Sequence, residues 1–151
     1  QMIASTTKLN TPGPDLAALP GVHALTDITG FGLAGHALEI ARGANCQVRI
    51  DWAKVPLLAG VRELATQGHV TGASGRNWAG YGEQVALPDG FAAVDQALLS
   101  DPQTSGGLLV SCDPAALGEV LAIFRRHGFE AASVIGEIAG APAEVPRLVV
   151  R

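Results

Sequence analysis

The stretch TDITGFGLAGH, residues 26–36, decides the fold because it joins an extended segment to a helix through a glycine-rich turn. Residues 22–28 predict a short extended segment, and residues 32–43 carry an apolar stripe with the period of a helix. Gly43 is placed to end that helix. Glycines in such a turn let the main chain come close to a ligand. The apolar stripe consists of Leu33, Ala37, Ile40 and Ala41.

The turn also has the chemistry of a phosphate and metal site. A helix N-terminus offers unpaired N–H groups and the positive end of a dipole, so Thr29, Gly30 and Gly32 are expected to line an anion. Asp27 adds a carboxylate, and Mg²⁺ is commonly held by one or two carboxylates with phosphate oxygens and water. The pattern is neither a Walker loop nor a dinucleotide fingerprint. A plain turn with a helix cap explains the same residues without a ligand, so both interpretations stay open.

A second motif, DPQTSGG, covers residues 101–107 and leads into the apolar strand LLV at 108–110. Its hydroxyl and amide side chains followed by paired glycines could form a second anion-binding nest. A polar connection between two elements is the simpler alternative. The candidate residues of this loop are Gln103, Thr104, Ser105, Gly106 and Gly107.

Helices and strands are mixed along the rest of the chain. Residues 69–90 contain several glycines and no apolar period, which predicts a long loop or flap. Together the elements predict one α+β domain over residues 1–151, a layered α/β sandwich with helices packed on one mixed sheet. The other expected elements are strands at 47–51, 133–138 and 147–150, a helix from Pro56 to Gly68, a helical stretch at 91–99, and a helix after Asp113 that ends at Gly128.

The composition argues against several classes of protein. The net charge is −4 and the only lysines are Lys8 and Lys54, so no basic face for nucleic acid is expected. The sequence has no run of about 18 apolar residues, so no membrane span is predicted. Without an export signal we expect a cytoplasmic protein with reduced thiols. The charged share of 16% is low, which fits a surface that another domain or subunit covers in part, although a core rich in Ala and Gly explains much of the same bias.

None of the nucleophilic side chains has a pattern that points to catalysis. Cys46 and Cys112 have no base nearby in sequence, and both are better explained as small packing residues. For His36, a core or helix-surface position is favoured over a phosphate contact. No catalytic residue is therefore assigned within this chain.

Taken together, ALTDITGFGLAGHALEIA (24–41) and LLSDPQTSGGLLVS (98–111) resemble the most characteristic stretches in the C-terminal half of the selenophosphate synthetase family. Their order and separation match, and the pair Arg76-Asn77 lies where that family has an Arg-Asn pair. The ending GEIAG…PRLVVR also resembles the close of the family's sequences. One departure is Leu25, where the family often has Cys.

The resemblance implies the C-terminal domain of the aminoimidazole ribonucleotide synthetase superfamily. It implies a homodimeric two-domain enzyme that makes selenophosphate from selenide and ATP, releases AMP and phosphate, and requires Mg²⁺. Asp27 would match one metal-binding aspartate of the family. The missing N-terminal domain would bind most of the ATP and carry the catalytic Lys and the Cys or selenocysteine.

On this interpretation the chain alone is inactive, and its partners are its own N-terminal domain and a second subunit. Two alternatives remain at this stage. One is another enzyme of the superfamily, such as a thiamine monophosphate kinase or a purine-pathway ligase. The other is a non-catalytic dimerisation or regulatory module that has kept the fold.

Overall fold

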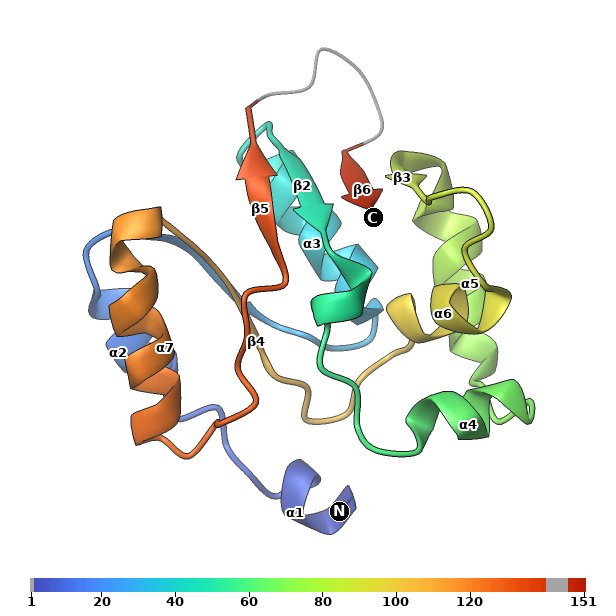
Figure 1. Cartoon of the computed structure of the whole chain (residues 1–151), viewed down its shortest axis with the longest axis horizontal. Helices are drawn as coiled ribbons and strands as arrows, with labels where there is room; N and C mark the ends of the chain where they lie inside the picture. The colour runs from blue at the N-terminus through green and yellow to red at the C-terminus, as the bar shows by residue number, and fades with distance from the viewer. Residues whose placement is uncertain (1, 141–146) are drawn as a thin grey trace.

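The computed structural model describes residues 2–140 and 147–151, with helices and strands in mixed order (Figure 1). This confirms the α+β class. The helices are α1 (Met2–Thr6), α2 (Gly13–Ala18), α3 (Gly32–Gly43), α4 (Val61–Thr66), α5 (Gly72–Tyr81), α6 (Ala93–Leu99) and α7 (Leu117–Arg126). The strands are β1 (Val22–Asp27), β2 (Gln47–Ile50), β3 (Val85–Ala86), β4 (Leu108–Cys112), β5 (Gly136–Ala139) and β6 (Leu148–Val150). Short 3₁₀ turns cover Trp52–Lys54, Gly82–Gln84 and Pro114–Ala116.

The described strands form two sheets instead of the single one expected. β1 and β4 pair as an antiparallel ribbon, and a four-stranded sheet has the order β3-β6-β2-β5. In that sheet β2 runs parallel to β6 and antiparallel to β5. The local apolar period predicts that a segment is a strand, but it carries no information on which distant segment will pair with it.

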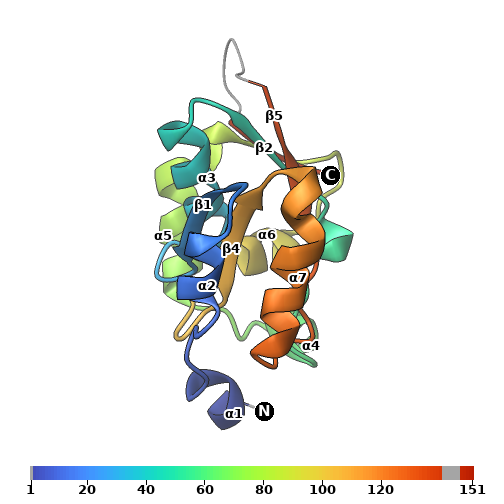
Figure 2. The same ribbon diagram turned by 90° about the vertical axis from the view of Figure 1, so that its left-hand side faces the viewer.

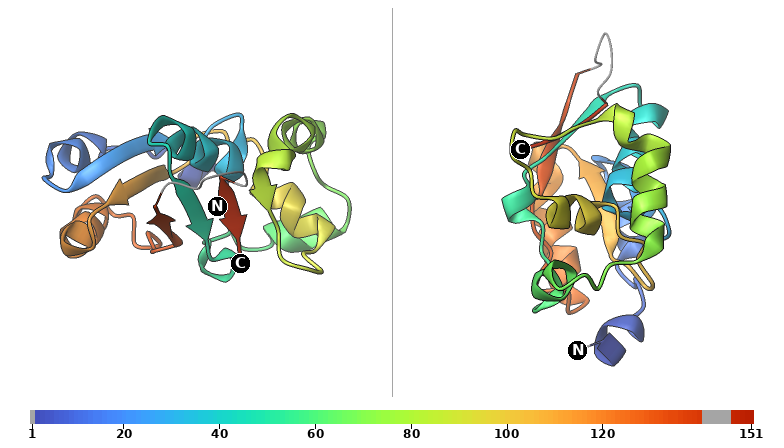
Figure 3. Two further views of the ribbon diagram at one scale, coloured as in Figure 1. Left: turned by 90° about the horizontal axis from the view of Figure 1, so that it is seen from above. Right: turned by 90° about the vertical axis from the view of Figure 1, so that its right-hand side faces the viewer.

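The larger core lies between α3 and the four-stranded sheet, which α3 covers on one face (Figure 3). Val48 and Ile50 of β2 are buried there, as their alternation predicts. On α3, Ala37 and Ala41 of the predicted stripe are fully buried, and Ala34 and Leu38 are buried with them. The buried arc of α3 is therefore wider than the predicted stripe.

A second core holds α2 and α7 against the β1–β4 ribbon (Figure 2). Leu16 of α2 is completely buried against Val120, Ile123 and Phe124 of α7. The helix α2 was not expected from the sequence, because six residues with a proline in the first turn give little local signal. Its position depends on this tertiary contact.

The expectation of a long loop over residues 69–90 is wrong, because α5 occupies the centre of this segment. The Thr71 side chain caps the helix by accepting a hydrogen bond from the Ser74 N–H at 3.3 Å. The inward stripe has helical spacing but is half polar, so a search for apolar periods does not detect it. Several glycines also lower the helix propensity. The stripe consists of Ser74, Asn77, Trp78 and Tyr81.

Two other helices begin later than predicted. The helix expected from Pro56 starts at Val61, and Leu64 of its predicted stripe is 51% exposed. After Pro114 the chain first makes a 3₁₀ turn, and α7 starts at Leu117. Within residues 2–140 and 147–151, no helix has the length and apolar character needed to cross a bilayer.

Candidate functional site

The two sequence motifs lie against each other because the strands that flank them are paired. Asp27, the last residue of β1, stands opposite Leu108, the first residue of β4. The loop that follows β1 and the loop that precedes β4 therefore meet at one end of the ribbon. We call residues 27–32 and 100–107 together the loop junction.

Main-chain hydrogen bonds continue the strand pairing into the loop junction. The Ile28 N–H donates to the Gly107 carbonyl at 2.9 Å, and the Gln103 N–H donates to the Thr29 carbonyl at 3.0 Å. The Gln103 side-chain amide donates to the main chain and the carboxylate of Asp101, at 3.1 and 3.2 Å. Each loop is thus held both by itself and by the other.

Glycines at two positions allow this close approach. A Cβ on Gly106 would lie 2.1 Å from the Ile28 carbonyl oxygen, and one on Gly32 would lie 2.7 Å from the Ser100 main-chain carbon. Gly32 also has a φ of +68°, which few other residues adopt. At Gly30, in contrast, a Cβ would meet nothing within 4 Å. Gly32 and Gly106 therefore serve the contact between the motifs, while Gly30 faces open space.

Helix α5 braces the loop junction with polar side chains. The Asn77 amide nitrogen donates to the Gly30 carbonyl at 2.8 Å and to the Ser100 carbonyl at 3.0 Å, so it bridges both loops. One turn earlier, the Ser74 hydroxyl donates to the Asp101 carboxylate at 3.1 Å. The segment expected to be a flap is therefore the part of the chain that ties the two motifs together.

Tyr81, at the end of α5, holds the tip of the first loop. Its hydroxyl donates to the Phe31 carbonyl at 2.7 Å. Burial raises the pKa of the Tyr81 phenol to about 12, so it keeps the proton that it donates at neutral pH. Gly35 of α3 leaves room for the tyrosine ring, since a Cβ there would lie 3.2 Å from it. The Phe31 ring itself is 55% exposed.

Asp27, the predicted metal ligand, is exposed at the end of β1, and its carboxylate makes no hydrogen bond or ion pair with the described residues. The main-chain N–H groups of Gly30 and Phe31 likewise have no partner in this part of the chain. No cluster of three or more His, Cys, Asp or Glu residues exists among residues 2–140 and 147–151. Asp27 could therefore hold a cation only together with ligands from outside these residues.

Thr29, a predicted phosphate-lining residue, is exposed but contacts a buried histidine. Its N–H donates to His36 Nε2 at 3.0 Å, and its hydroxyl oxygen lies 3.0 Å from the same nitrogen. The other ring nitrogen of His36 lies 2.8 Å from a Glu39 carboxylate oxygen. His36 is only 6% exposed, which selects the core position from the core and helix-surface positions that the sequence left open.

The candidate groups of the second loop are largely directed to protein contacts. Ser105 donates its hydroxyl to the Thr6 carbonyl at 3.0 Å, and Asn10 donates its side-chain amide to the Gly106 carbonyl at 2.9 Å. Thr104 is exposed and makes no side-chain hydrogen bond with the described residues. The start of the chain thus helps to hold this loop in place.

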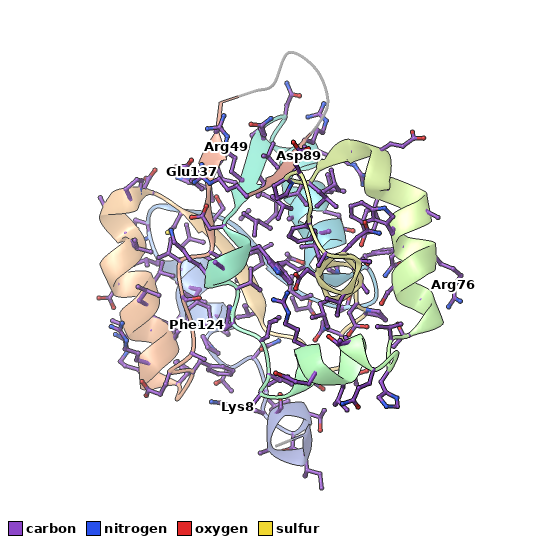
Figure 4. All side chains as sticks on the ribbon, turned by 45° about the vertical axis from the view of Figure 1, so that its right-hand side comes forward. Lys8, Arg49, Arg76, Asp89, Phe124 and Glu137 are labelled. Carbon is purple, nitrogen blue, oxygen red and sulfur yellow. The ribbon has the colours of Figure 1, made fainter. Side chains whose placement is uncertain are left out.

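A hollow of about 240 Å³ lies beside the loop junction, between α3 and α5. Arg76 projects outward from α5 (Figure 4) and forms no ion pair with the described residues. Arg42 on the opposite wall donates to the Gln84 side chain at 3.0 Å. The hollow therefore carries two cationic groups close to the tip of the first loop, beside one carboxylate, that of Glu39.

The two cysteines behave as packing residues. Cys46 is 7% exposed in the larger core. Cys112 is partly buried in β4, and burial together with the charge of Asp113 raises the pKa of its thiol. A thiol with a raised pKa is mostly uncharged at neutral pH and is a poor nucleophile. The prediction that Cys46 is a small buried residue is confirmed.

The sequence patterns predicted no functional role for Asn77 or His36. For Asn77, the available signal was the helical spacing of Ser74, Asn77 and Tyr81. This spacing is detected only when polar residues are counted together with apolar ones on the inward face of a helix. For His36, the available signal was its position in the second turn of α3, close to the loop that contains Thr29 and leads into this helix.

Comparison with known proteins shows what this chain is similar to. The family described as "AIR synthase related protein, C-terminal domain" matches residues 5–148. A protein of Burkholderia ambifaria named "Selenide, water dikinase" is 63% identical over 145 residues, which are 96% of this chain and 41% of that protein. Proteins of the same name from Pseudomonas straminea and Rhizobium meliloti are 61% and 49% identical, over 93% and 96% of the chain. The chain thus spans about two fifths of the length of these relatives.

The solved structures support the fold. Escherichia coli HypE, a hydrogenase maturation protein, matches 84% of this chain and 32% of its own, with a TM-score of 0.59 and 21% sequence identity. A second HypE structure gives a TM-score of 0.58 over 90% of this chain. At this level of identity the similarity concerns the architecture alone.

The close approach of the two loops yields a prediction for Gly106→Ala. The added Cβ collides with the Ile28 carbonyl, so the loops must separate and the free energy of unfolding should fall by about 3 kcal/mol. Gly107→Ala is the matched control, because a Cβ there meets nothing within 4 Å, and its effect should stay within about 0.5 kcal/mol. Denaturant unfolding of both variants measures this. Equal stabilities would contradict the packing described for the loop junction.

The bridging role of Asn77 yields a second prediction. Asn77→Ala removes two hydrogen bonds that join the loops, so the free energy of unfolding should fall by about 1–2 kcal/mol. Arg76→Ala, at the neighbouring exposed position of α5, should change it by no more than about 0.5 kcal/mol. Thermal and denaturant unfolding of the two variants provide the comparison. A loss for Arg76→Ala as large as that for Asn77→Ala would contradict a specific bridge.

Proposed function

The chain belongs to the family of AIR synthase related proteins, as their C-terminal domain, and from this premise we propose that it is the C-terminal domain of a selenophosphate synthetase (selenide, water dikinase). The observation that carries the proposal is the identity of 63% to a protein of that name over 145 of 151 residues. Such a long alignment necessarily includes both loops of the junction. The intact enzyme would convert ATP, selenide and water into selenophosphate, AMP and phosphate.

In this proposal the tip of the first loop faces the transferred phosphate. Gly30 contributes a free main-chain N–H and space for close approach. Thr29 contributes its hydroxyl, because its N–H is already bound to His36. Gly32 contributes its conformation, since its N–H donates to the Thr29 carbonyl at 3.1 Å. The predicted second anion loop, Gln103 to Gly107, stabilises the first loop through the main-chain hydrogen bonds between them.

Asp27 would hold Mg²⁺ together with phosphate oxygens, water and carboxylates of the N-terminal domain. The exposed Asp27 carboxylate supports this role, because it makes no hydrogen bond or ion pair with the described residues. When bound, Mg²⁺ neutralises charge that develops on the phosphoryl group. What this chain does is to orient one carboxylate and one set of N–H groups toward that charge.

The partners in this proposal are the N-terminal domain of the same polypeptide and a second subunit. The N-terminal domain would bind most of the ATP and supply the catalytic Lys and the Cys or selenocysteine. Arg42 and Arg76 in the hollow next to the loop junction add positive charge on the side where an anionic substrate would lie. The enzyme would act in the cytoplasm, where ATP and reduced thiols are available.

The alternatives from sequence receive no specific support. A thiamine monophosphate kinase, a purine-pathway ligase or a regulatory module would share the architecture. The likeness to HypE at 21% identity concerns that architecture only. The relatives with 49 to 63% identity carry the dikinase name, which favours the synthetase.

Substitution of Asp27 by Asn in the full-length enzyme tests the metal role. The substitution keeps shape and hydrogen bonding but removes the charge, so the selenide-dependent rate should fall by about a hundredfold or more. Raised Mg²⁺ or added Mn²⁺ should recover part of the loss, while stability should change by about 1 kcal/mol or less. Asp89→Asn, an exposed aspartate after β3 (Figure 4), is the matched control and should keep the full rate. A near-normal rate for Asp27→Asn would remove Asp27 as a metal ligand.

The isolated chain provides a further test. We expect it to unfold cooperatively, because two cores hold its helices and strands, and to release no AMP from ATP with selenide and Mg²⁺. AMP release is measured by chromatography, with the full-length enzyme as the positive control. Turnover by the purified chain would show that the N-terminal domain is not needed for catalysis.

A further inference from the structure

We propose that His36 is the positioning residue of the first loop, because its Nε2 accepts a hydrogen bond from the Thr29 main-chain N–H. Glu39 holds the imidazole ring in the tautomer that leaves Nε2 able to accept this bond. The role in substrate binding rests on the function proposed above, whereas the structural lock does not. Three residues take part: Thr29 in the loop, His36 in the second turn of α3, and Glu39 one turn further.

The contacts around the imidazole ring are short and largely hidden from water. His36 Nε2 lies 3.0 Å from both the Thr29 main-chain nitrogen and the Thr29 hydroxyl oxygen. Nδ1 lies 2.8 Å from a carboxylate oxygen of Glu39. With 6% of the residue exposed, water cannot readily replace these partners. A buried polar ring of this kind is held firmly only when each nitrogen has its partner.

The tautomer follows from the Thr29 N–H. A main-chain N–H can only donate, so Nε2 must accept and carry no proton. In neutral imidazole the proton then sits on Nδ1, where it is donated to Glu39. The Glu39 side chain is 49% exposed, and its carboxylate oxygen accepts this hydrogen bond.

The same three groups have the connectivity of a hydroxyl–imidazole–carboxylate nucleophile, but the geometry speaks against that role. Activation of a hydroxyl requires a free lone pair on the imidazole to take the proton. Here the single Nε2 lone pair is already used by the Thr29 N–H. The ring therefore fixes the loop and does not activate the hydroxyl.

The consequence concerns the groups on either side of Thr29. Asp27 precedes it, and the unpartnered N–H groups of Gly30 and Phe31 follow it. Fixing the main chain at Thr29 limits the directions that all three can face. The Asn77 bond to the Gly30 carbonyl and the Tyr81 bond to the Phe31 carbonyl hold the other side of the same loop. His36 thus supplies the contact from α3 that complements the contacts from α5.

The lock itself is tested by nuclear magnetic resonance on the isotopically labelled 151-residue chain. In the wild type we expect the Nδ1–H tautomer of His36, a scalar coupling between His36 Nε2 and the Thr29 amide, and slow exchange of that amide. His36→Leu should speed the exchange of the Thr29 amide by about fivefold or more. His36→Gln should restore slow exchange, because its side-chain oxygen can accept the same bond. Glu39→Ala should lower the share of the Nδ1–H tautomer.

His127→Leu is the matched control, because His127 also joins a threonine hydroxyl and a carboxylate, those of Thr11 and Asp15, each at 2.9 Å. It lies at the C-terminal end of α7, away from the first loop, and its loss should leave the Thr29 amide unchanged. If His36→Leu does not fold, the Gln and Glu39→Ala variants still decide the question. The proposal is overturned if the Thr29 amide of His36→Gln exchanges about fivefold or more faster than that of the wild type, or if the wild type holds the Nε2–H tautomer.

The role in substrate binding is tested separately in the full-length enzyme. His36→Leu should lower kcat/KM for Mg-ATP by about tenfold, as for other residues that orient a ligand-binding group through a hydrogen bond. His36→Gln should recover most of this loss, and His127→Leu should match the wild type. Unchanged kcat/KM in His36→Leu would overturn the positioning role. If the wild-type enzyme shows no selenide-dependent activity, the proposed function fails, while the resonance experiment still decides the lock.

Discussion

The antiparallel pairing of β1 with β4 is the constraint on which the site depends. It sets Asp27 opposite Leu108 and therefore brings together two loops, residues 27–32 and 100–107, that are far apart in the chain. Close contact is then possible only where a side chain is missing, which Gly32 and Gly106 provide. Glycines that resemble a phosphate cradle thus serve in part to let one main chain approach another.

The contacts that stabilise the loop junction are mainly polar. Asn77 donates to both loops, Ser74 binds Asp101, and Tyr81 binds Phe31. Hydrogen bonds of this kind specify one geometry more narrowly than apolar packing, because donors and acceptors must match in direction as well as distance. To provide these hydrogen bonds, α5 carries polar as well as apolar side chains on its inward face.

The main-chain carbonyl and N–H groups of the first loop differ in whether they have hydrogen-bond partners among the described residues. Main-chain carbonyls of Gly30 and Phe31 are bound by α5, while their N–H groups and the Asp27 carboxylate have no partner among the described residues. Unpaired donors and a carboxylate within one loop suit the proposed ligand, which carries both negative charge and a cation, such as a metal-bound phosphate. This asymmetry links the packing of the domain to its proposed role at the edge of a larger active site.

The sequence by itself determined the α+β class, the α3 helix after its glycine turn, and the alternation of Val48 and Ile50. These follow from local period and from residue chemistry. Only the tertiary structure decided that the strands divide between two sheets and that residues 72–81 form a helix. It also decided that Asn77 and His36 hold the first loop from opposite sides. The reason is that partner choice and polar bridging depend on residues far apart in sequence, and no local pattern records which distant groups will meet.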